Sequence, residues 1–126
     1  DSPIPIALDE ELIGIDDTNI KLEMLQKINP SYIILKPSLC GGFFGSNEWI
    51  KLANGNSIGW WVTSALESNI GLNAIAQWVS TLNTKMPQGL GTGLLYTNNI
   101  NSPLEQIDDV LTYNKNKSWE IPSEIL

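Results

Sequence analysis

The stretch Tyr32-Ile33-Ile34-Leu35-Lys36-Pro37-Ser38 decides how this sequence is interpreted. Its first four residues are apolar, which predicts a buried β-strand, and a lysine follows directly. Because an unpaired ammonium group is costly in a low-dielectric interior, we expect Lys36 to be desolvated, paired or catalytic. The earlier segment Ile6-Ala7-Leu8-Asp9-Glu10 is an apolar run that ends in acids. Two successive strands that carry opposite charges at their carboxyl ends suggest an α/β active site.

The composition bounds the function. A chain of 126 residues allows one domain at most, and 42% hydrophobic residues with five tryptophans indicate a globular protein. The formal net charge is -7, and all seven cations are lysines. Arginine, the preferred ligand of phosphate groups, is absent, so we expect no nucleic-acid partner. Histidine is absent too, which excludes histidine-based triads and zinc sites on this chain.

Other features of the sequence bear on the cellular compartment and on processing. The lone Cys40 cannot form an internal disulfide, which fits a reducing compartment, and we expect a cytoplasmic location. The sequence has no window of roughly 18 apolar residues that would span a membrane. No signal peptide is visible, and the chain begins with Asp1-Ser2-Pro3 rather than an initiator Met. We therefore expect a processed or truncated piece of a longer protein.

Strands and helices are expected to alternate along the chain. Strands are predicted over residues 4–8, 32–35, 58–63 and, briefly, 86–90. The first predicted helix begins at a cap provided by Asp16 or Asp17, ends near residue 28 and carries an apolar face. A glycine-rich loop over 41–45 precedes a helix over 46–53, and further helices are predicted over 70–82 and 104–111. The face of the first helix is formed by Ile20, Met24, Leu25 and Ile28.

The strand ends near residues 9, 36, 63 and 90 recur at a spacing of about 27 residues. Strands that alternate with helices imply parallel pairing and right-handed crossovers. Four such βα units make half of a (β/α)8 barrel, although a small doubly wound sheet fits the same pattern. The charges favour the barrel, because barrel enzymes place catalytic residues at the carboxyl ends of their strands. We expect the barrel half over residues 1–107 and a tail over 108–126.

Four short motifs fall at this spacing. They are Ala7-Leu8-Asp9-Glu10-Glu11, Ile34-Leu35-Lys36-Pro37-Ser38-Leu39, the stretch from Val62 to Leu72, and Gly89-Leu90-Gly91-Thr92. Together they resemble the last four barrel strands of the enolase superfamily and, within it, the o-succinylbenzoate synthase family of menaquinone biosynthesis. The motifs of that family read D-E-S, K-P-x-L-x-G, S-S-x-E-S-x-x-G-L and G-L-x-T. The resemblance covers roughly residues 4–93.

The resemblance implies strands five to eight of a modified (β/α)8 barrel, in an enzyme with a separate capping domain. It implies a lyase that removes a proton α to a carboxylate and then loses hydroxide, which dehydrates a cyclohexadiene carboxylate to o-succinylbenzoate. The implied cofactor is Mg2+ or Mn2+. A divalent cation with oxygen ligands would neutralise the second charge that develops on the substrate carboxylate.

Two charged residues match the reacting centre of the family. The resemblance implies that Asp9 is the third metal-ligating carboxylate. It also implies that Lys36 is a catalytic cation, which faces the substrate opposite a base on the second strand. From the residues alone, Asp9 could instead cap a helix or lie in a solvated turn, and Lys36 could extend to the rim of the sheet.

Three further residues match the substrate-binding positions. Thr63 and Ser64 correspond to paired serines that hold the distal carboxylate of the substrate, with Thr63 replacing the commoner serine. The alternative is that both hydroxyl groups cap the following loop. Gly89 corresponds to a glycine whose backbone approaches the substrate. Gly91 stands where the family usually has Asp.

The motifs of the second, third and fourth strands are not in this sequence. We therefore expect the other metal ligands to lie outside the chain, and the chain to be inactive alone. A half-barrel exposes strand edges, which predicts self-association or a missing amino-terminal half as partner. Two alternatives stay open. One is a dipeptide epimerase or N-acylamino acid racemase of the same superfamily. The second is a small α/β binding module, in which Asp9 and Lys36 would not converge.

Overall fold

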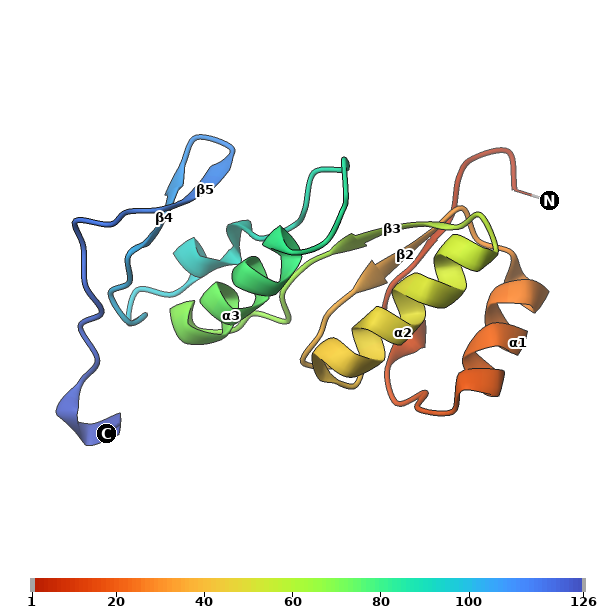
Figure 1. Ribbon diagram of the computed structural model, residues 1–126, viewed down its shortest axis with the longest axis horizontal. Coiled ribbons are helices and arrows are strands. Elements are labelled where there is room, and N and C mark those ends of the chain that lie inside the picture. The colour runs from red at the N-terminus through yellow and green to blue at the C-terminus, as the bar shows by residue number, and fades with distance from the viewer. Residues whose placement is uncertain (1, 126) are drawn as a thin grey trace. The chain divides into compact units, whose positions relative to one another are not determined.

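A computed structural model describes residues 2–125, and it describes Ile125 by its backbone alone. The chain separates into two compact units (Figure 1). The first unit comprises the residues up to Ala65 together with Lys85–Gln88, and the second comprises Leu66–Thr84 and the residues from Gly89 onward. Among the described helices, none combines the length and the apolar character needed to cross a membrane.

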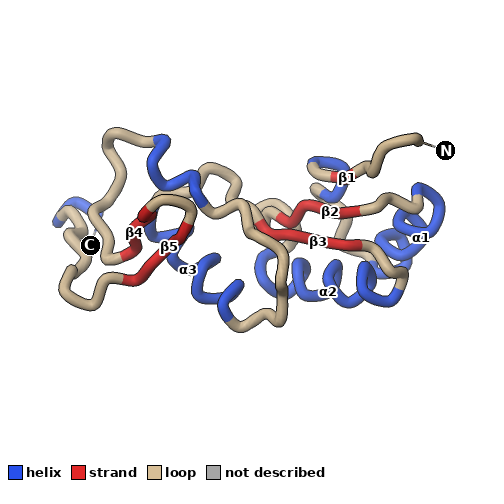
Figure 2. Tube along the Cα trace, turned by 90° about the horizontal axis from the view of Figure 1, so that it is seen from above, coloured by secondary structure: helices blue, strands red, loops and turns tan. Residues whose placement is uncertain are grey.

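The first unit is built on a parallel three-stranded sheet. Its strands are β1 (Ala7–Leu8), β2 (Tyr32–Leu35) and β3 (Gly59–Val62), in the order β1-β2-β3 (Figure 2). All pairs are parallel, as the βα alternation predicted. The bounds predicted for β2 are confirmed, whereas β1 begins three residues later than expected. Pro5 lacks the N–H that a strand ladder requires, which explains the late start.

Helices α1 (Thr18–Ile28) and α2 (Gly42–Gly55) follow β1 and β2 and cover the same face of the sheet (Figures 1 and 2). The predicted cap of α1 is confirmed at Asp17, whose carboxylate accepts hydrogen bonds from the backbone N–H groups of Asn19 and Ile20 at 2.8 and 3.1 Å.

The predicted apolar face of α1 is wrong in part. Lys21 and Leu25 are the buried residues of this helix, whereas Ile20 and Ile28 are exposed. The helix turns a lysine toward α2, where an acid and an aromatic ring receive it. The hydrophobic pattern could not show this orientation, because the partners of Lys21 lie on another element.

The glycine-rich segment after β2 is part of α2 rather than a loop. The predicted loop over 41–45 is therefore wrong, and the helix begins four residues earlier than expected. Gly41 and Gly42 have φ values of 82° and 68°, a backbone conformation that glycine adopts most readily. At Gly45, an added Cβ would come within 2.2 Å of the Cys40 carbonyl oxygen. Glycine at this position lets the helix pack directly on the preceding turn.

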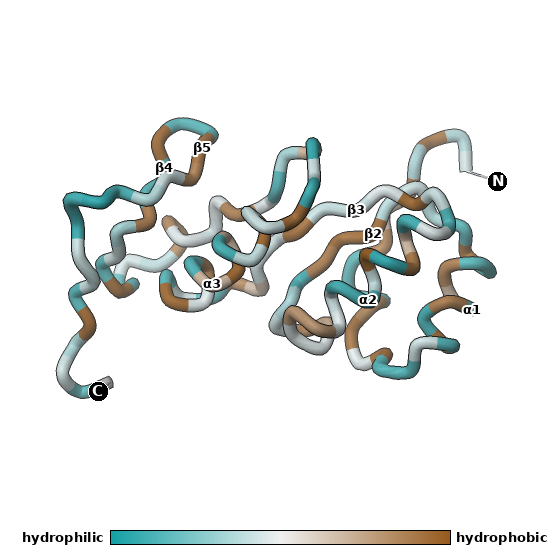
Figure 3. Tube along the Cα trace, viewed as in Figure 1, coloured by the Kyte–Doolittle hydropathy of each residue, from teal (hydrophilic) through white to brown (hydrophobic). Residues whose placement is uncertain are grey.

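The core of the first unit lies between the sheet and the two helices. Alternate strand residues are buried there, and Trp49 and Ala53 of α2 are fully buried. Figure 3 shows that β2 is more apolar than β3. The strand residues buried on this side are Leu8, Ile33, Leu35 and Val62.

The Gln88 side chain forms a hydrogen bond with the backbone of β3 on the side away from β2. The predicted strand over 86–90 is an irregular segment in which Gly89 alone forms a β-bridge. The side-chain oxygen of Gln88 accepts a hydrogen bond from the Val62 N–H at 2.8 Å. Its amide nitrogen donates to the Met86 carbonyl oxygen, also at 2.8 Å. The Gln88 side chain thus takes a backbone hydrogen bond that a neighbouring strand would otherwise make.

The second unit contains helix α3 (Asn69–Ser80), close to the predicted 70–82. Ser68 precedes it but makes no side-chain capping bond. The side-chain oxygen of Asn99 instead accepts a hydrogen bond from the Asn69 N–H at 2.8 Å. The side-chain amide of Asn69 in turn donates to the Ile100 carbonyl at 2.6 Å. The helix is therefore capped from a segment about thirty residues further along the chain.

The predicted helix over 104–111 is wrong. The structure has an antiparallel hairpin of β4 (Leu104–Ile107) and β5 (Val110–Tyr113). Asp108 has a φ of 52° and opens its two-residue turn, which is a turn conformation that Asp tolerates. The hairpin runs across residue 107, and the division of the chain at that residue stays a prediction. Short 3-10 turns complete this unit at η2 (Gly91–Leu95) and η3 (Ser123–Ile125).

Candidate active site

The carboxyl ends of the three parallel strands carry the predicted charged and hydroxyl residues. Asp9 follows β1, Lys36 follows β2 and Thr63 follows β3. The residue before each of them is buried on the helix-covered side of the sheet. Because successive strand residues point to opposite faces, the three side chains belong to the face away from the helices. The ladder continues to this point, since the Thr63 N–H donates to the Leu35 carbonyl at 2.9 Å.

Asp9 and Lys36 form an ion pair. The ammonium nitrogen of Lys36 lies 2.8 Å from Asp9 Oδ1 and 3.7 Å from Glu10 Oε1. The side chain of Lys36 is 17% exposed and that of Asp9 is 40% exposed. The hydrogen bond with Asp9 raises the pKa of Lys36 above its ordinary value, although burial opposes the shift. Lys36 is therefore held as a cation on a face that stays open to solvent.

The local geometry contradicts a capping role for Asp9. The residue precedes a 3-10 turn, η1 (Glu10–Leu12), but its carboxylate makes no capping hydrogen bond. The backbone N–H of Asp9 instead donates to Glu11 Oε2 at 2.9 Å. Hydrogen bonds from the backbone N–H groups of Glu11 itself and of Asp9 lower the pKa of the Glu11 carboxyl. The Asp9 carboxylate is thus left for Lys36.

The contact between Asp9 and Lys36 also argues against a rim lysine and against a small binding module. A lysine that only reached the rim of the sheet would be well exposed, whereas Lys36 is largely covered and paired. A binding module was expected to keep Asp9 and Lys36 apart, and their contact contradicts that expectation. Asp9 and Lys36, on which the predicted chemistry depends, therefore lie together at the carboxyl ends of β1 and β2.

The predicted substrate-binding residues are distributed over both units. Thr63 is half-buried and Ser64 is 4% exposed, and both belong to the first unit. Gly89 belongs to the second unit. The roles of these three residues stay predictions.

The described part of the chain does not provide a complete metal site by itself. Within residues 2–125, no group of three or more acidic or cysteine residues is placed to hold a metal ion. Magnesium requires near-octahedral oxygen coordination and usually retains several waters, so one carboxylate binds it poorly. Asp9 can supply one oxygen ligand, and a metal would need its other protein ligands from elsewhere.

The sequence analysis did not predict the buried charge of Lys21. Lys21 of α1 is 2% exposed, its ammonium lies 2.5 Å from Glu48 Oε2, and it is 5.3 Å from the centre of the Trp49 ring. The hydroxyl of Thr18 also donates to Glu48. The hydrogen bond from Lys21, and then that from Thr18, lowers the pKa of Glu48. This closed cluster joins the two helices, and sequence periodicity gave no signal for it.

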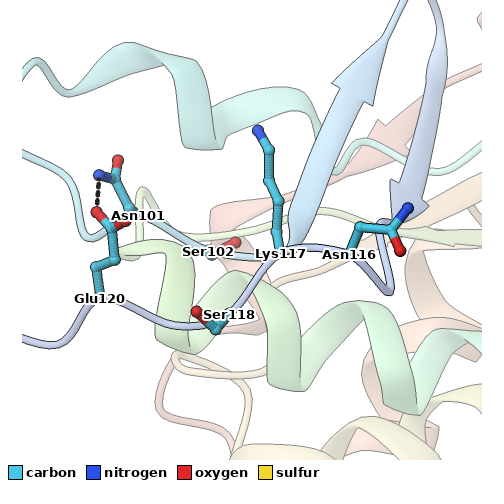
Figure 4. A pocket seen from close by; sticks show the side chains of 6 residues that line it. All are labelled: Asn101, Ser102, Asn116, Lys117, Ser118 and Glu120. Carbon is cyan, nitrogen blue, oxygen red and sulfur yellow. Dashed lines mark hydrogen bonds between the residues drawn. The ribbon is translucent and has the colours of Figure 1, made fainter.

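The second unit has a polar hollow of its own (Figure 4). The side-chain amide of Asn101 donates to Glu120 at 2.6 Å, and Lys117 pairs with Glu105 at 2.5 Å. None of the predicted site residues lines this hollow, and we assign it no role. Its lining comprises Asn101, Ser102, Asn116, Lys117, Ser118 and Glu120.

The structure consists in part of parallel βα units that present an acid and a lysine at adjacent strand ends. The fold is that of a segment of an enolase-superfamily barrel, as solved structures of that class confirm. The particular relative is o-succinylbenzoate synthase. The chain is 60% identical to that protein from Desulfotalea psychrophila (strain LSv54 / DSM 12343) over 103 residues, or 82% of this chain. The resemblance predicted from the motifs is confirmed.

The solved structures agree. The crystal structure of MenC from Desulfotalea psychrophila LSv54 matches 87% of the chain with a TM-score of 0.82 and 57% identity, and the match covers 31% of that protein. The L-Ala-D/L-Glu epimerase from Bacillus subtilis matches 89% of the chain with a TM-score of 0.74. Its identity of 18%, over 31% of its own length, supports the fold alone. No family model matches the chain.

The chain spans 28% of the length of the curated relative that it matches.

Proposed function

We propose that this chain supplies part of the active site of an o-succinylbenzoate synthase-type carbon–oxygen lyase. The observation that carries the proposal is the 2.8 Å contact of Asp9 with Lys36 at the carboxyl edge, in a chain 60% identical to such a synthase. On this proposal the chain acts in menaquinone biosynthesis in the cytoplasm. The substrate is a cyclohexadiene carboxylate, which is dehydrated to o-succinylbenzoate.

Each residue has a distinct role in this proposal. Lys36 stabilises the negative charge that develops on the substrate once the proton α to its carboxylate is removed. Asp9 keeps Lys36 protonated and contributes one oxygen ligand to Mg2+ or Mn2+, whose other ligands lie outside the chain. The bound cation would supply charge neutralisation at the substrate carboxylate. Thr63 and Ser64 hold the distal carboxylate of the substrate, and Gly89 is the glycine whose backbone approaches the substrate.

The proposal predicts that the chain needs a partner. The base and the remaining metal ligands would come from a polypeptide equivalent to the rest of the synthase. We expect the purified chain to be inactive. Mixing it with the part of the Desulfotalea psychrophila synthase outside the matched region should restore Mg2+-dependent dehydration of the cyclohexadiene carboxylate, measured by chromatography of the product.

Lys36 provides the decisive variant in the mixture. Lys36→Met should lower the rate by at least about 100-fold, because removal of one group that stabilises developing charge has an effect of this size. The exposed helix residue Glu23 offers a control, and Glu23→Ala should leave the rate unchanged. Dehydration by the isolated chain, or an unchanged rate with Lys36→Met, would contradict the proposal.

A further inference from the structure

Asp9, which follows β1, has an unusual backbone conformation. Asp9 precedes η1 with φ of -121° and ψ of -89°, outside the usual helical and extended regions. An aspartate in this position commonly accepts a hydrogen bond from a backbone N–H of the following turn. The carboxylate of Asp9 makes no such bond and lies against Lys36 instead. Something other than its own capping bond must therefore hold this turn.

The Glu11 side chain accepts a hydrogen bond from the backbone of this turn. Its Oε2 accepts the hydrogen bond of the Asp9 N–H at 2.9 Å, and its carboxylate also interacts with its own backbone N–H. The Glu11 side chain thus reaches back across two residues to the N–H of Asp9.

Two backbone hydrogen bonds and one buried side chain hold the rest of the turn. Leu12 is fully buried, and its N–H donates to the Asp9 carbonyl at 3.3 Å. The Ile13 N–H closes the next turn on the Glu10 carbonyl at 3.1 Å. The buried Leu12 fixes the carbonyl side of Asp9, and Glu11 fixes its N–H side. The Asp9 backbone is thereby held at both of its polar groups.

We propose that Glu11 is a positioning residue that directs the Asp9 carboxylate toward Lys36 by holding the backbone N–H of Asp9. A capping aspartate would commit one carboxylate oxygen to the turn. With Glu11 providing the stabilising contact, neither oxygen of the Asp9 carboxylate is committed to the turn, and Oδ1 pairs with Lys36. The inference rests on the proposed function insofar as Asp9 serves there as a metal ligand.

The test measures the orientation of Asp9 in the full 126-residue chain by NMR, with neither substrate nor metal. Three-bond couplings of the Asp9 side chain report its χ1 rotamer, and hydrogen exchange reports its amide. Glu11→Ala removes the acceptor, whereas Glu11→Gln keeps an acceptor oxygen of the same reach. Glu23→Ala, at an exposed site of α1, is the control.

We expect one Asp9 rotamer in the wild type, Glu11→Gln and Glu23→Ala. In Glu11→Ala the rotamers should average, and the Asp9 amide should exchange about threefold to tenfold faster, as expected for loss of one hydrogen bond. A single rotamer in Glu11→Ala, or averaging in Glu11→Gln, would overturn the inference. Because no catalysis is measured, these outcomes are independent of whether the proposed lyase activity is found.

Discussion

The first unit contains two lysine–acid pairs, and they differ in what surrounds them. Lys21 is 2% exposed, pairs with Glu48 at 2.5 Å and lies over the Trp49 ring. Lys36 is 17% exposed and pairs with Asp9 at 2.8 Å, while Asp9 itself is 40% exposed. The first pair is closed between two helices. The second lies at the carboxyl ends of β1 and β2, where the Asp9 side chain remains partly exposed to solvent.

The comparison shows that burial of a charge does not mark a functional site by itself. The more deeply buried lysine is paired between its own two helices and does not follow a strand in the sequence. The less buried lysine has the position that the chemistry needs, at the carboxyl end of a parallel strand. Its location at the end of a parallel strand and its partly exposed acid partner distinguish Lys36 from Lys21.

The largest effect on stability is expected at the closed pair. Glu48→Ala leaves the buried ammonium of Lys21 without its counter-charge and should lower the free energy of unfolding by about 3 kcal/mol, measured by urea denaturation. Glu23→Ala should change it by less than about 0.5 kcal/mol. The double variant Lys21→Met, Glu48→Leu should recover most of the loss, since an apolar pair needs no compensation.

A smaller effect is expected at the open pair. Lys36→Met should lower the free energy of unfolding by about 1 kcal/mol or less, because the Asp9 carboxylate can regain water. The same urea titration measures it. If Lys36→Met proved as destabilising as Glu48→Ala, the distinction between a closed and an open pair would fail.

The two pairs should also respond to pH at opposite ends of the range. Because Lys21 lowers the pKa of Glu48, the stabilisation from Glu48 is present above about pH 4.3 and is lost as the pH falls through the folded-state pKa. Because Asp9 raises the pKa of Lys36, the stabilisation from Lys36 is present below about pH 10.4 and is lost as the pH rises through the folded-state pKa.

These directions can be separated by variants. Glu48→Gln should weaken the acid dependence of unfolding, while Lys36→Met should weaken the alkaline dependence. Urea midpoints across the two pH ranges measure both. An acid-side change in Lys36→Met, with none in Glu48→Gln, would reverse the assignment.

The face that carries Lys36 should also govern self-association. The helix-covered face is closed, whereas Ile34 lies on the opposite face and is only half-buried. We expect light scattering at micromolar concentration to show species larger than a monomer. Ile34→Lys should shift the distribution toward the monomer, because it places a charge on that face. A clean monomer in the unmodified chain would contradict the expectation.

Local signals predicted much of the first unit. The apolar run of β2 and the cap at Asp17 are short-range features, and both are confirmed. The meeting of Asp9 with Lys36 could be predicted from the parallel βα order, which brings strand ends to one edge. The burial of Lys21 could not be predicted, because it depends on Glu48 and Trp49 across a helix interface.

The second unit was harder to predict. Leu104, Ile107 and Leu111 recur at helical spacing, yet the segment is a hairpin. Its turn at Asp108 was the stronger local signal, because a two-residue loop with a left-handed residue reverses a strand pair. The capping of α3 by Asn99 depends on a remote segment, and no sequence pattern could indicate it.

The Gln88 side chain at the edge of β3 has a consequence for assembly. It occupies the Val62 N–H and is itself tied to Met86. A strand that joined here would first have to displace this amide, exchanging one acceptor for another with little net gain in hydrogen bonding. The Gln88 side chain therefore protects the β3 edge of the sheet. An added strand would have to compete with Gln88 for the Val62 N–H.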